Sequence, residues 1–238
     1  MKISIQQPEF FPWLGYFDKL YQVDKVVFLD NVQFKKRYFE NRNKVRTRDG
    51  WMWLNTPVKT KGRYTQKIMD AEIDNSKPWQ KRIVSAIRCN YRRAPYWEYY
   101  GESICGIVSR PYKFLVDFNL SVILFLMEKL GVKREWCLSS ALSTEDLGSD
   151  LILEICRKMQ ATDYLSGKDG KSYLKEDGFV KNGIKLHYQN FIHPVYKQFH
   201  GGFFEGMSVI DLLFNHGSES TDIIKGINLS KAVNNETS

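Results

Sequence analysis

The residue types best suited to chemistry occur in a loop near the start of the chain. An apolar alternation at residues 3–5 leads into paired glutamines, two prolines, several aromatic residues and Gly15. Pro8 and Pro12 fix φ and lack a backbone donor, so neither a strand nor a helix continues through this loop. Open α/β proteins bind ligands at the carboxyl end of the first strand, and the loop is therefore predicted to belong to a site.

In this interpretation, Gln7 and the loop amides hold an anionic or carbonyl group of a ligand. Trp13, Gly15 and Tyr16 are expected to lie beside that ligand, with the glycine allowing a close approach that any side chain would block. The structural alternative is a hydrophobic plug, in which the aromatic residues fill the core and the glutamines cap backbone groups.

A basic and aromatic segment is the second group of candidates, and it follows the second expected strand. Its members are Asp30, Gln33, Lys35, Lys36, Arg37, Tyr38, Asn41, Arg42 and Asn43. Cations with interleaved aromatic rings suit a phosphate or pyrophosphate whose base or sugar stacks on a ring. A solvated basic hairpin explains the same residues. Nucleic acid is an unlikely partner, because the charges do not extend into a long stripe.

The third candidate is a loop with small residues and two lysines after another apparent strand. Ser166, Gly167 and Lys168 lead into a short turn that contains Lys171. Backbone amides and mobile ammonium groups in such a loop can surround a phosphate. The spacing is not that of a P-loop, and an exposed turn is an equally good explanation.

The fourth candidate segment contains His193, Tyr196 and Gln198, and Ser208 and Asp211 follow it. His193 is a candidate general base, because imidazole titrates near neutrality, although a structural histidine with hydrogen-bonded nitrogens is the more common case. Ser208 and Asp211 have the spacing of helix-capping residues. The four histidines of the chain lack carboxylates at ligand spacing, so no metal site is predicted.

Three elements near the N-terminus must position the first two groups. Residues 2–6 and 25–29 are expected to be strands, and residues 13–22 a helix between them. This βαβ unit requires parallel strands, whose carboxyl ends meet at one edge of the sheet. The first loop and the basic segment are therefore expected to share that edge. Residues 44–47 and 51–58 flank Asp49-Gly50 and predict a hairpin.

The rest of the chain predicts an α/β layer with a helical insertion. Helices are expected at 78–91, 96–109, 113–130 and 144–159, with Gly131 ending the third and Ser143 with Asp146 capping the fourth. Strands are expected at 162–166 and 184–188, with a turn at 168–171, and a last helix runs from Ser208 to its stop at Gly217. The expected organisation is an N-terminal α/β part (1–75), a helical insertion (76–160), a C-terminal part that completes the same domain (161–227) and a flexible tail (228–238).

Composition limits the class of protein. A net charge of +8 and a sequence pI near 9.2 favour an anionic partner. The four cysteines form no CxxC pair and no signal peptide is evident, so they are expected to be reduced thiols of a cytoplasmic protein. The most apolar window, residues 114–130, is too short and too polar to predict a membrane span.

The four segments, in this order, resemble the WbqC-like family. The matching residues are Gln7-Pro8-Glu9-Phe10-Phe11-Pro12-Trp13-Leu14-Gly15-Tyr16-Phe17, then 28–34 with 41–43, 164–167 with 173–174, 196–198 and 207–217. The resemblance implies a bacterial cytoplasmic protein that is associated with surface-polysaccharide and O-antigen biosynthesis. The family usually has histidine where this chain has Gln6. A weaker likeness is to the nucleotidylyltransferase superfamily, in which Trp13-Leu14-Gly15-Tyr16 would stand in the place of a His-x-Gly-His motif and keep only its glycine. This likeness implies a Rossmann-like parallel sheet.

Together, residues and resemblance predict a transferase that modifies a nucleotide-activated sugar by acylating or aminoacylating a sugar amine. Lys35, Arg37 and Arg42 would hold the diphosphate, and His193 would take the amine proton, with Asp30 as the second candidate base. No cofactor or acyl donor, and no oligomeric state, can be predicted from the sequence. The alternatives are a nucleotidylyltransferase-like enzyme and a non-catalytic nucleic-acid or glycan-binding module.

Overall fold

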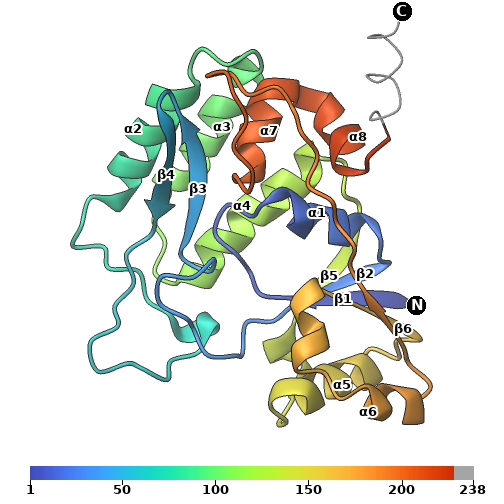
Figure 1. The fold of residues 1–238 in the computed structure, drawn as a ribbon. Helices are drawn as coiled ribbons and strands as arrows, with labels where there is room; N and C mark the ends of the chain where they lie inside the picture. The colour runs from blue at the N-terminus through green and yellow to red at the C-terminus, as the bar shows by residue number, and fades with distance from the viewer. Residues whose placement is uncertain (228–238) are drawn as a thin grey trace, which may run out of the picture.

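A five-stranded parallel sheet lies at the centre of the computed structural model, which describes residues 1–227 (Figure 1). The predicted tail, residues 228–238, lies outside the described residues. The strands are ordered β5-β2-β1-β6-β7, and each neighbouring pair is parallel. Their bounds are Lys2–Gln6 (β1), Lys25–Phe28 (β2), Glu135–Leu138 (β5), Asp163–Ser166 (β6) and Lys185–Tyr188 (β7).

The strand order contains a topological switch point at β1. The chain moves outward from β1 through β2 to β5, and then crosses back to place β6 and β7 on the other side of β1. The loops that follow β1 and β6 therefore leave the sheet edge in opposite directions and open a crevice between them, where open α/β sheets bind ligands. The predicted α/β class with a Rossmann-like parallel sheet is confirmed.

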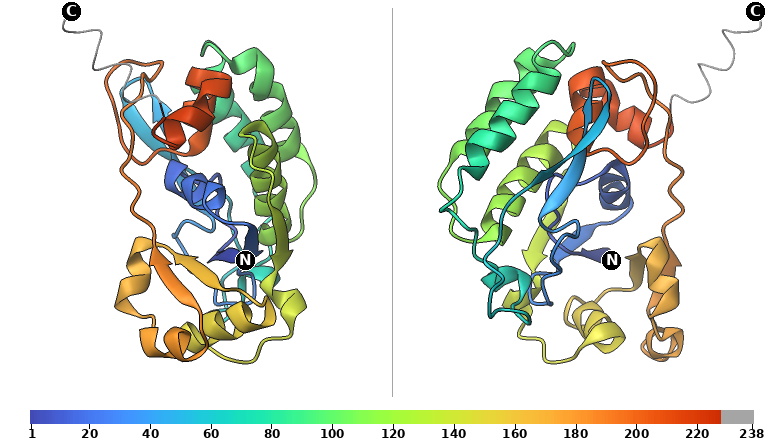
Figure 2. Two further views of the ribbon diagram at one scale, coloured as in Figure 1. Left: turned by 90° about the vertical axis from the view of Figure 1, so that its right-hand side faces the viewer. Right: turned by 60° about the vertical axis from the view of Figure 1, so that its left-hand side comes forward.

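Helices cover both faces of the sheet, because the side chains of each strand alternate between them (Figures 1 and 2). Ile3, Ile5 and Val27 pack with α5 (Gly148–Lys158) and α6 (Glu176–Lys181). Val26 and Phe28 point to the opposite face and join a larger core. This larger core includes residues of α1 (Leu14–Tyr21), α4 (Leu115–Lys129) and α7 (Val209–His216).

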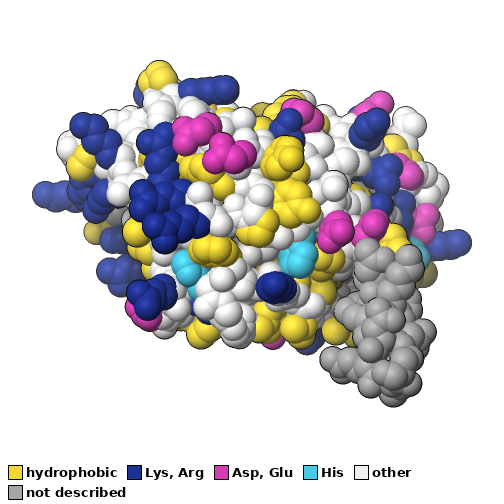
Figure 3. Space-filling model, turned by 90° about the horizontal axis from the view of Figure 1, so that it is seen from above, with side chains coloured by type: hydrophobic (Ala, Val, Ile, Leu, Met, Phe, Trp, Pro, Cys, Tyr) yellow, Lys and Arg dark blue, Asp and Glu magenta, His cyan; other side chains and the backbone are white. Residues whose placement is uncertain are grey.

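The remaining helices and a separate two-stranded hairpin lie beside the sheet. These elements are α2 (Trp79–Tyr91), α3 (Trp97–Ser109), α8 (Ser220–Ile224) and the antiparallel strands β3 (Arg42–Thr47) and β4 (Gly50–Asn55). The Asp49-Gly50 turn signal is thus confirmed. Figure 3 shows the molecule from above relative to Figure 1. On that face, Lys and Arg side chains gather mainly on one side, and acidic and hydrophobic groups are interspersed elsewhere.

Several elements differ from the sequence-based expectation. Strand β5 lies within the stretch expected to be helical, and α6 was not predicted. The turn expected at 168–171 is part of a 3-10 helix, η3 (Lys168–Ser172), and three more such turns span Ile68–Asp70, Ser139–Leu142 and Gly217–Glu219. Within residues 1–227, no helix is long and apolar enough to cross a membrane.

The capping predictions had mixed outcomes. The capping box on the fourth helix was wrong, because α5 begins at Gly148 after Leu147 and the Glu154 carboxylate accepts the backbone N–H groups of Glu145 and Asp146. Ser143 instead has left-handed backbone geometry, with φ of 50°. Two other signals were confirmed: Ser208 caps α7 by accepting the Ile210 N–H, and Gly217 ends that helix with φ of 54°.

Candidate functional site

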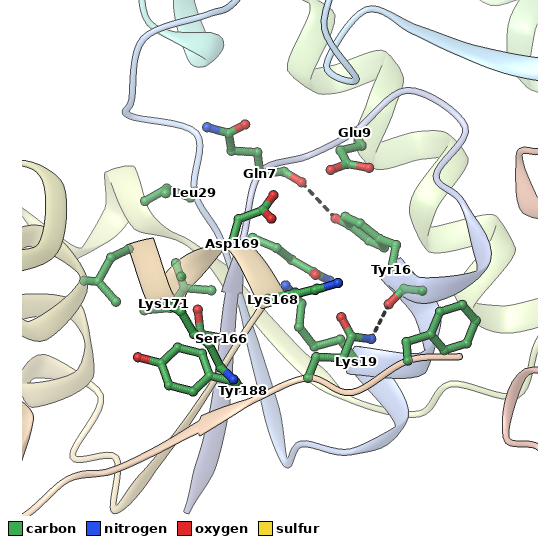
Figure 4. Close-up of a pocket in the computed structure, with 18 of the residues that line it drawn as sticks. Gln7, Glu9, Tyr16, Lys19, Leu29, Ser166, Lys168, Asp169, Lys171 and Tyr188 are labelled. Carbon is green, nitrogen blue, oxygen red and sulfur yellow. Dashed lines mark hydrogen bonds between the residues drawn. The ribbon is translucent and has the colours of Figure 1, made fainter. Parts of the chain in front are cut away.

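A polar cavity of about 780 Å³ opens at the switch point, beside the carboxyl ends of β1 and β6 (Figure 4). Its walls come from the first loop, α1, the segment after β2, the β6–η3 loop and the end of β7. The polar and aromatic lining residues are Gln6, Gln7, Glu9, Trp13, Tyr16, Lys19, Lys35, Tyr38, Tyr164, Ser166, Lys168, Asp169, Lys171, Tyr173, Tyr188, Gln189, Asn190 and Phe191.

The first-loop wall contains all four of its predicted residues, Gln7, Trp13, Gly15 and Tyr16. The Tyr16 hydroxyl donates to the Gln7 carbonyl oxygen at 3.1 Å and so fixes the loop against α1 (Figure 4). A Cβ on Gly15 would lie 2.3 Å from the Trp13 ring, so the glycine makes room for this indole rather than for a ligand. The Gly15 carbonyl also accepts a hydrogen bond from Gln189 at 2.7 Å.

The opposite wall is the β6–η3 loop, which brings Ser166, Gly167 and Lys168 to the cavity as predicted. The loop packs tightly: a Cβ on Gly170 would lie 2.0 Å from the Ser166 hydroxyl oxygen, so no other residue fits there without a shift. Lys168 and Lys171 are exposed and carry their positive charge on this wall. The loop therefore supplies two cations next to a rigid backbone.

Glu9 and Lys19 are two cavity residues whose pKa values burial moves towards neutrality, and sequence reasoning missed both. Burial raises the pKa of the Glu9 carboxyl to about 8, and the nearby Lys19 charge offsets part of that rise. Burial lowers the pKa of the Lys19 ammonium to about 8, against the attraction of Glu9. Perturbed groups in a cleft are candidates for function. Among the described residues, neither side chain forms an ion pair within 4.0 Å.

Buried polar atoms without hydrogen-bond partners occur in the cavity wall and near it. Gln6 is 7% exposed, and neither its amide nitrogen nor its amide oxygen has a hydrogen-bond partner within residues 1–227. The same holds for Glu9 Oε2 and for both carboxyl oxygens of the fully buried Glu40. Burial also raises the pKa of Glu40 to about 7. An unsatisfied buried polar atom costs about 1–3 kcal/mol, so such a cluster calls for an explanation.

The basic and aromatic segment is divided by the fold. Lys35 and Tyr38 line the cavity, whereas Gln33, Arg37, Asn41, Arg42 and Asn43 do not. Arg42 and Asn43 do not line it because they belong to β3, which leads away from the sheet edge (Figure 1). The Arg42 guanidinium lies 4.2 Å from the centre of the Trp53 ring instead of facing a phosphate.

The amides of this segment make structural contacts. Asn43 donates to the Phe11 carbonyl at 2.8 Å, which ties the hairpin to the first loop. Asn41 donates to the Thr56 carbonyl at 3.1 Å, and Gln33 donates to the Tyr64 carbonyl at 2.8 Å. These donors are already occupied, so the residues support the site instead of contacting a ligand in it.

Neither predicted base lines the cavity. The Asp30 carboxylate accepts hydrogen bonds from the Ser139 hydroxyl, the Ser140 amide and the Ser140 hydroxyl, at 2.7–2.9 Å. His193 donates from Nδ1 to the Pro194 carbonyl at 2.9 Å and accepts the Gly206 N–H at Nε2, at 3.3 Å. Burial lowers the pKa of this imidazole, and both of its nitrogens are engaged. The structural alternative therefore describes His193 better than the catalytic one, and the buried Asp30 carboxylate is likewise held by hydrogen bonds within the protein.

Tyr196 and Gln198 do not line the cavity and belong instead to buried hydrogen-bond networks. The Asp211 carboxylate accepts the Tyr196 hydroxyl at 2.8 Å and the Tyr91 hydroxyl at 2.9 Å. The Gln198 amide oxygen accepts from Arg46 Nε at 3.1 Å and from the Phe204 N–H at 3.0 Å. The predicted capping role is confirmed for Ser208. The Asp211 carboxylate instead accepts the two tyrosine hydroxyls, a role that its spacing did not predict.

The sequence did contain a signal for Lys19, because its spacing of three residues from Tyr16 places the two on one side of the expected helix. Six of the eight residues of α1 are buried, and Lys19 is among them, so a lysine stands on the apolar side of a short helix. Long charged side chains are rarely buried without a partner. Within the described part of the chain, no three His, Cys, Asp or Glu side chains cluster as a metal site would require.

A doubly wound parallel sheet defines an α/β protein, and its polar cavity lies at the switch point, where such sheets bind ligands. The chain belongs to the WbqC-like protein family, whose model matches residues 7–223. It is also similar to the uncharacterized protein Rv1507c of Mycobacterium tuberculosis, with 31% identity over 226 residues that cover 94% of this chain and 97% of that protein. No solved structure matches the chain.

Proposed function

We propose that this protein is a transferase that modifies a nucleotide-activated sugar in bacterial glycan assembly, by acylation or aminoacylation of a sugar amine. One observation carries the proposal: cations, aromatic rings and two groups that titrate near neutrality line a single cavity at the switch point. Membership of the WbqC-like family agrees with it.

The outer part of the cavity suits the nucleotide diphosphate. Lys35, Lys168 and Lys171 are exposed lysines from two walls, and ammonium groups bind phosphate oxygens through charge-assisted hydrogen bonds. Aromatic rings stand next to two of them, with Lys35 Nζ 5.3 Å from the Tyr38 ring centre and Lys171 Nζ 5.3 Å from that of Tyr188. Such rings can stack on a base or a sugar. In this proposal Arg37 and Arg42 have no contact with the diphosphate.

The inner part of the cavity suits an amine. The carboxyl of Glu9 lines the cavity, and its pKa of about 8 means that it can take up or release a proton near neutral pH. A general base with a pKa near the working pH is the most efficient one. Glu9 therefore replaces His193 as the group that would hold a sugar or donor amine or accept its proton.

A binding panel followed by a transfer assay tests the proposal. Nucleotide sugars with and without a free amine should raise the melting temperature of the full chain, and Lys168→Met and Lys171→Met should each weaken binding by about 10-fold or more. Lys181→Met is the matched control, because Lys181 is exposed on α6 and away from the cavity lining.

The transfer assay adds acyl and aminoacyl donors and follows the mass of the nucleotide sugar. A mass increase that requires a free sugar amine would support the proposal. If no nucleotide sugar binds, and oligonucleotides instead bind with a steep salt dependence, the proposal is wrong and a nucleic-acid-binding module replaces it.

A further inference from the structure

Three polar side chains at the inner end of the cavity have no side-chain partner among residues 1–227. Gln6 has both amide atoms buried and unpartnered, and Glu9 has a buried, unpartnered carboxyl oxygen. Lys19 is 9% exposed and makes no ion pair within 4.0 Å among residues 1–227. All three line the same cavity, and they come from the end of β1, the first loop and α1.

The three groups could have satisfied one another but do not. An acid and a lysine that served only stability would form a hydrogen-bonded ion pair, because unpaired buried charges are expensive. Here the Glu9 and Lys19 charges influence each other, yet they form no ion pair within 4.0 Å, and both side chains line the cavity. A cavity wall with one group of each sign fits a ligand that carries both signs.

The chemistry of the three side chains defines that ligand. A lysine ammonium donates to an anion, a carboxylate accepts from a cation, and the Gln6 amide supplies one donor group and one acceptor. We propose that the inner end of the cavity binds the zwitterionic head of a free α-amino acid, with its carboxylate on Lys19 and its ammonium on Glu9. The Gln6 amide then completes the hydrogen bonds of the head group.

The surroundings of Lys19 agree with this assignment. Its Nζ lies 3.8 Å from the position that a Cβ of Gly167 would occupy, so no side chain at residue 167 intrudes on the space beside the ammonium. Burial moves the titration of both Glu9 and Lys19 towards neutrality, and the opposite charges of a zwitterion would return each to its charged form. The outer lysines remain available for a diphosphate.

This inference deepens the proposed function, on which it rests for its biological meaning: the amino acid would occupy the part of the cavity that the proposed function assigns to an amine. Binding itself can be measured without any transfer assay, so the two proposals can fail separately. Nucleotide sugars report on the outer lysines, and amino acids report on the inner end.

Isothermal titration of the full chain with each proteinogenic amino acid tests the inference, with and without a saturating nucleotide sugar. We expect at least one amino acid to bind in one of the two conditions. Its amide, which lacks the carboxylate, and its N-acetyl derivative, which lacks the ammonium, should each bind at least about 10-fold more weakly, as for loss of one charge-assisted contact. Equal binding of the amide and the acetylated form, or no binding by any amino acid, would overturn the inference.

Variants locate the binding. Lys19→Met and Glu9→Gln keep the size of each side chain and should both abolish binding of the amino acid, whereas Lys168→Met should weaken the nucleotide sugar and spare the amino acid. If Lys168→Met abolished amino-acid binding while Lys19→Met retained it, the ligand would lie at the outer lysines and the inference would be wrong. Binding of nucleotide sugars without amino acids leaves only the proposed function standing, and the reverse outcome leaves only this inference.

Discussion

Two buried polar clusters of this protein differ in how far they satisfy their own hydrogen bonds. Around Asp211, the Tyr91 and Tyr196 hydroxyls both donate to one carboxylate. At the inner end of the cavity, Gln6 and Glu9 keep buried atoms without any partner in the described part of the chain. Asp211 and Tyr196 of the first cluster, and Gln6 and Glu9 of the second, come from segments that the sequence marks as candidates for chemistry.

The difference separates a structural cluster from a candidate site. A satisfied network stabilises one conformation and leaves no group to meet a ligand. An unsatisfied one lowers the stability of the empty protein and gains its partners when a ligand binds. Variants in the two clusters should therefore act on different properties.

The largest expected effect is on transfer. Glu9→Gln should lower turnover by about 10²–10⁴-fold, because glutamine can neither accept a proton nor neutralise an ammonium group. Initial rates of the mass-detected transfer measure it, and His193→Gln is the matched control with essentially unchanged turnover. Full activity of a folded Glu9→Gln variant would contradict the role proposed for the cavity.

The next largest effect is on the free energy of unfolding and concerns the cluster around Asp211. Asp211→Ala should reduce the free energy of unfolding by about 3 kcal/mol, because two buried tyrosine hydroxyls lose their acceptor. Urea unfolding followed by tryptophan fluorescence measures the change. Gln6→Leu, which removes two unpartnered polar atoms, should leave stability equal or higher. A loss as large as that of Asp211→Ala would show that Gln6 has an internal partner after all.

A smaller effect distinguishes cations that line the cavity from those that do not. Lys168→Met should weaken binding of a nucleotide sugar by about 1.5–3 kcal/mol, as expected for a charge-assisted hydrogen bond. Arg42→Ala should change it by less than about 0.5 kcal/mol, since its guanidinium stacks on Trp53. Titration calorimetry compares the two, and the opposite ranking would return the basic hairpin to the site.

The smallest effect is a pH dependence of stability. The pKa of Glu40 is raised by burial to about 7, above its usual 4.5, so its neutral form stabilises the folded state. That contribution is fully present below pH 4.5 and is lost as the pH rises through 7. As the pH rises from about 5 to 8, the free energy of unfolding of the unmodified chain should therefore fall by on the order of 1–2 kcal/mol more than that of the Glu40→Gln variant. Parallel curves for the two proteins would show that Glu40 titrates normally.

The local predictions succeeded where neighbouring residues decide the structure. Alternating apolar residues with short connections predicted β1, α1 and β2, and Asp49-Gly50 predicted the hairpin. Strand β5 was missed because Glu135 and Trp136 are exposed at the edge of the sheet and show no buried alternation. Its place is set by pairing with β2, a contact that spans more than a hundred residues and that no local pattern contains.

For the candidate site, the sequence by itself determined the residue types, the class of fold and the convergence of the first loop and the β6–η3 loop at one sheet edge. That edge follows from parallel strands, which a βαβ pattern requires. Only the tertiary structure decided which polar groups remain available. Lys19 and His193 are both partly or fully buried, but backbone atoms occupy both nitrogens of His193, while Lys19 faces the cavity without an ion-pair partner in residues 1–227. Hydrogen-bond partners distant in the chain made that difference, because side-chain chemistry is local whereas its satisfaction depends on the whole fold.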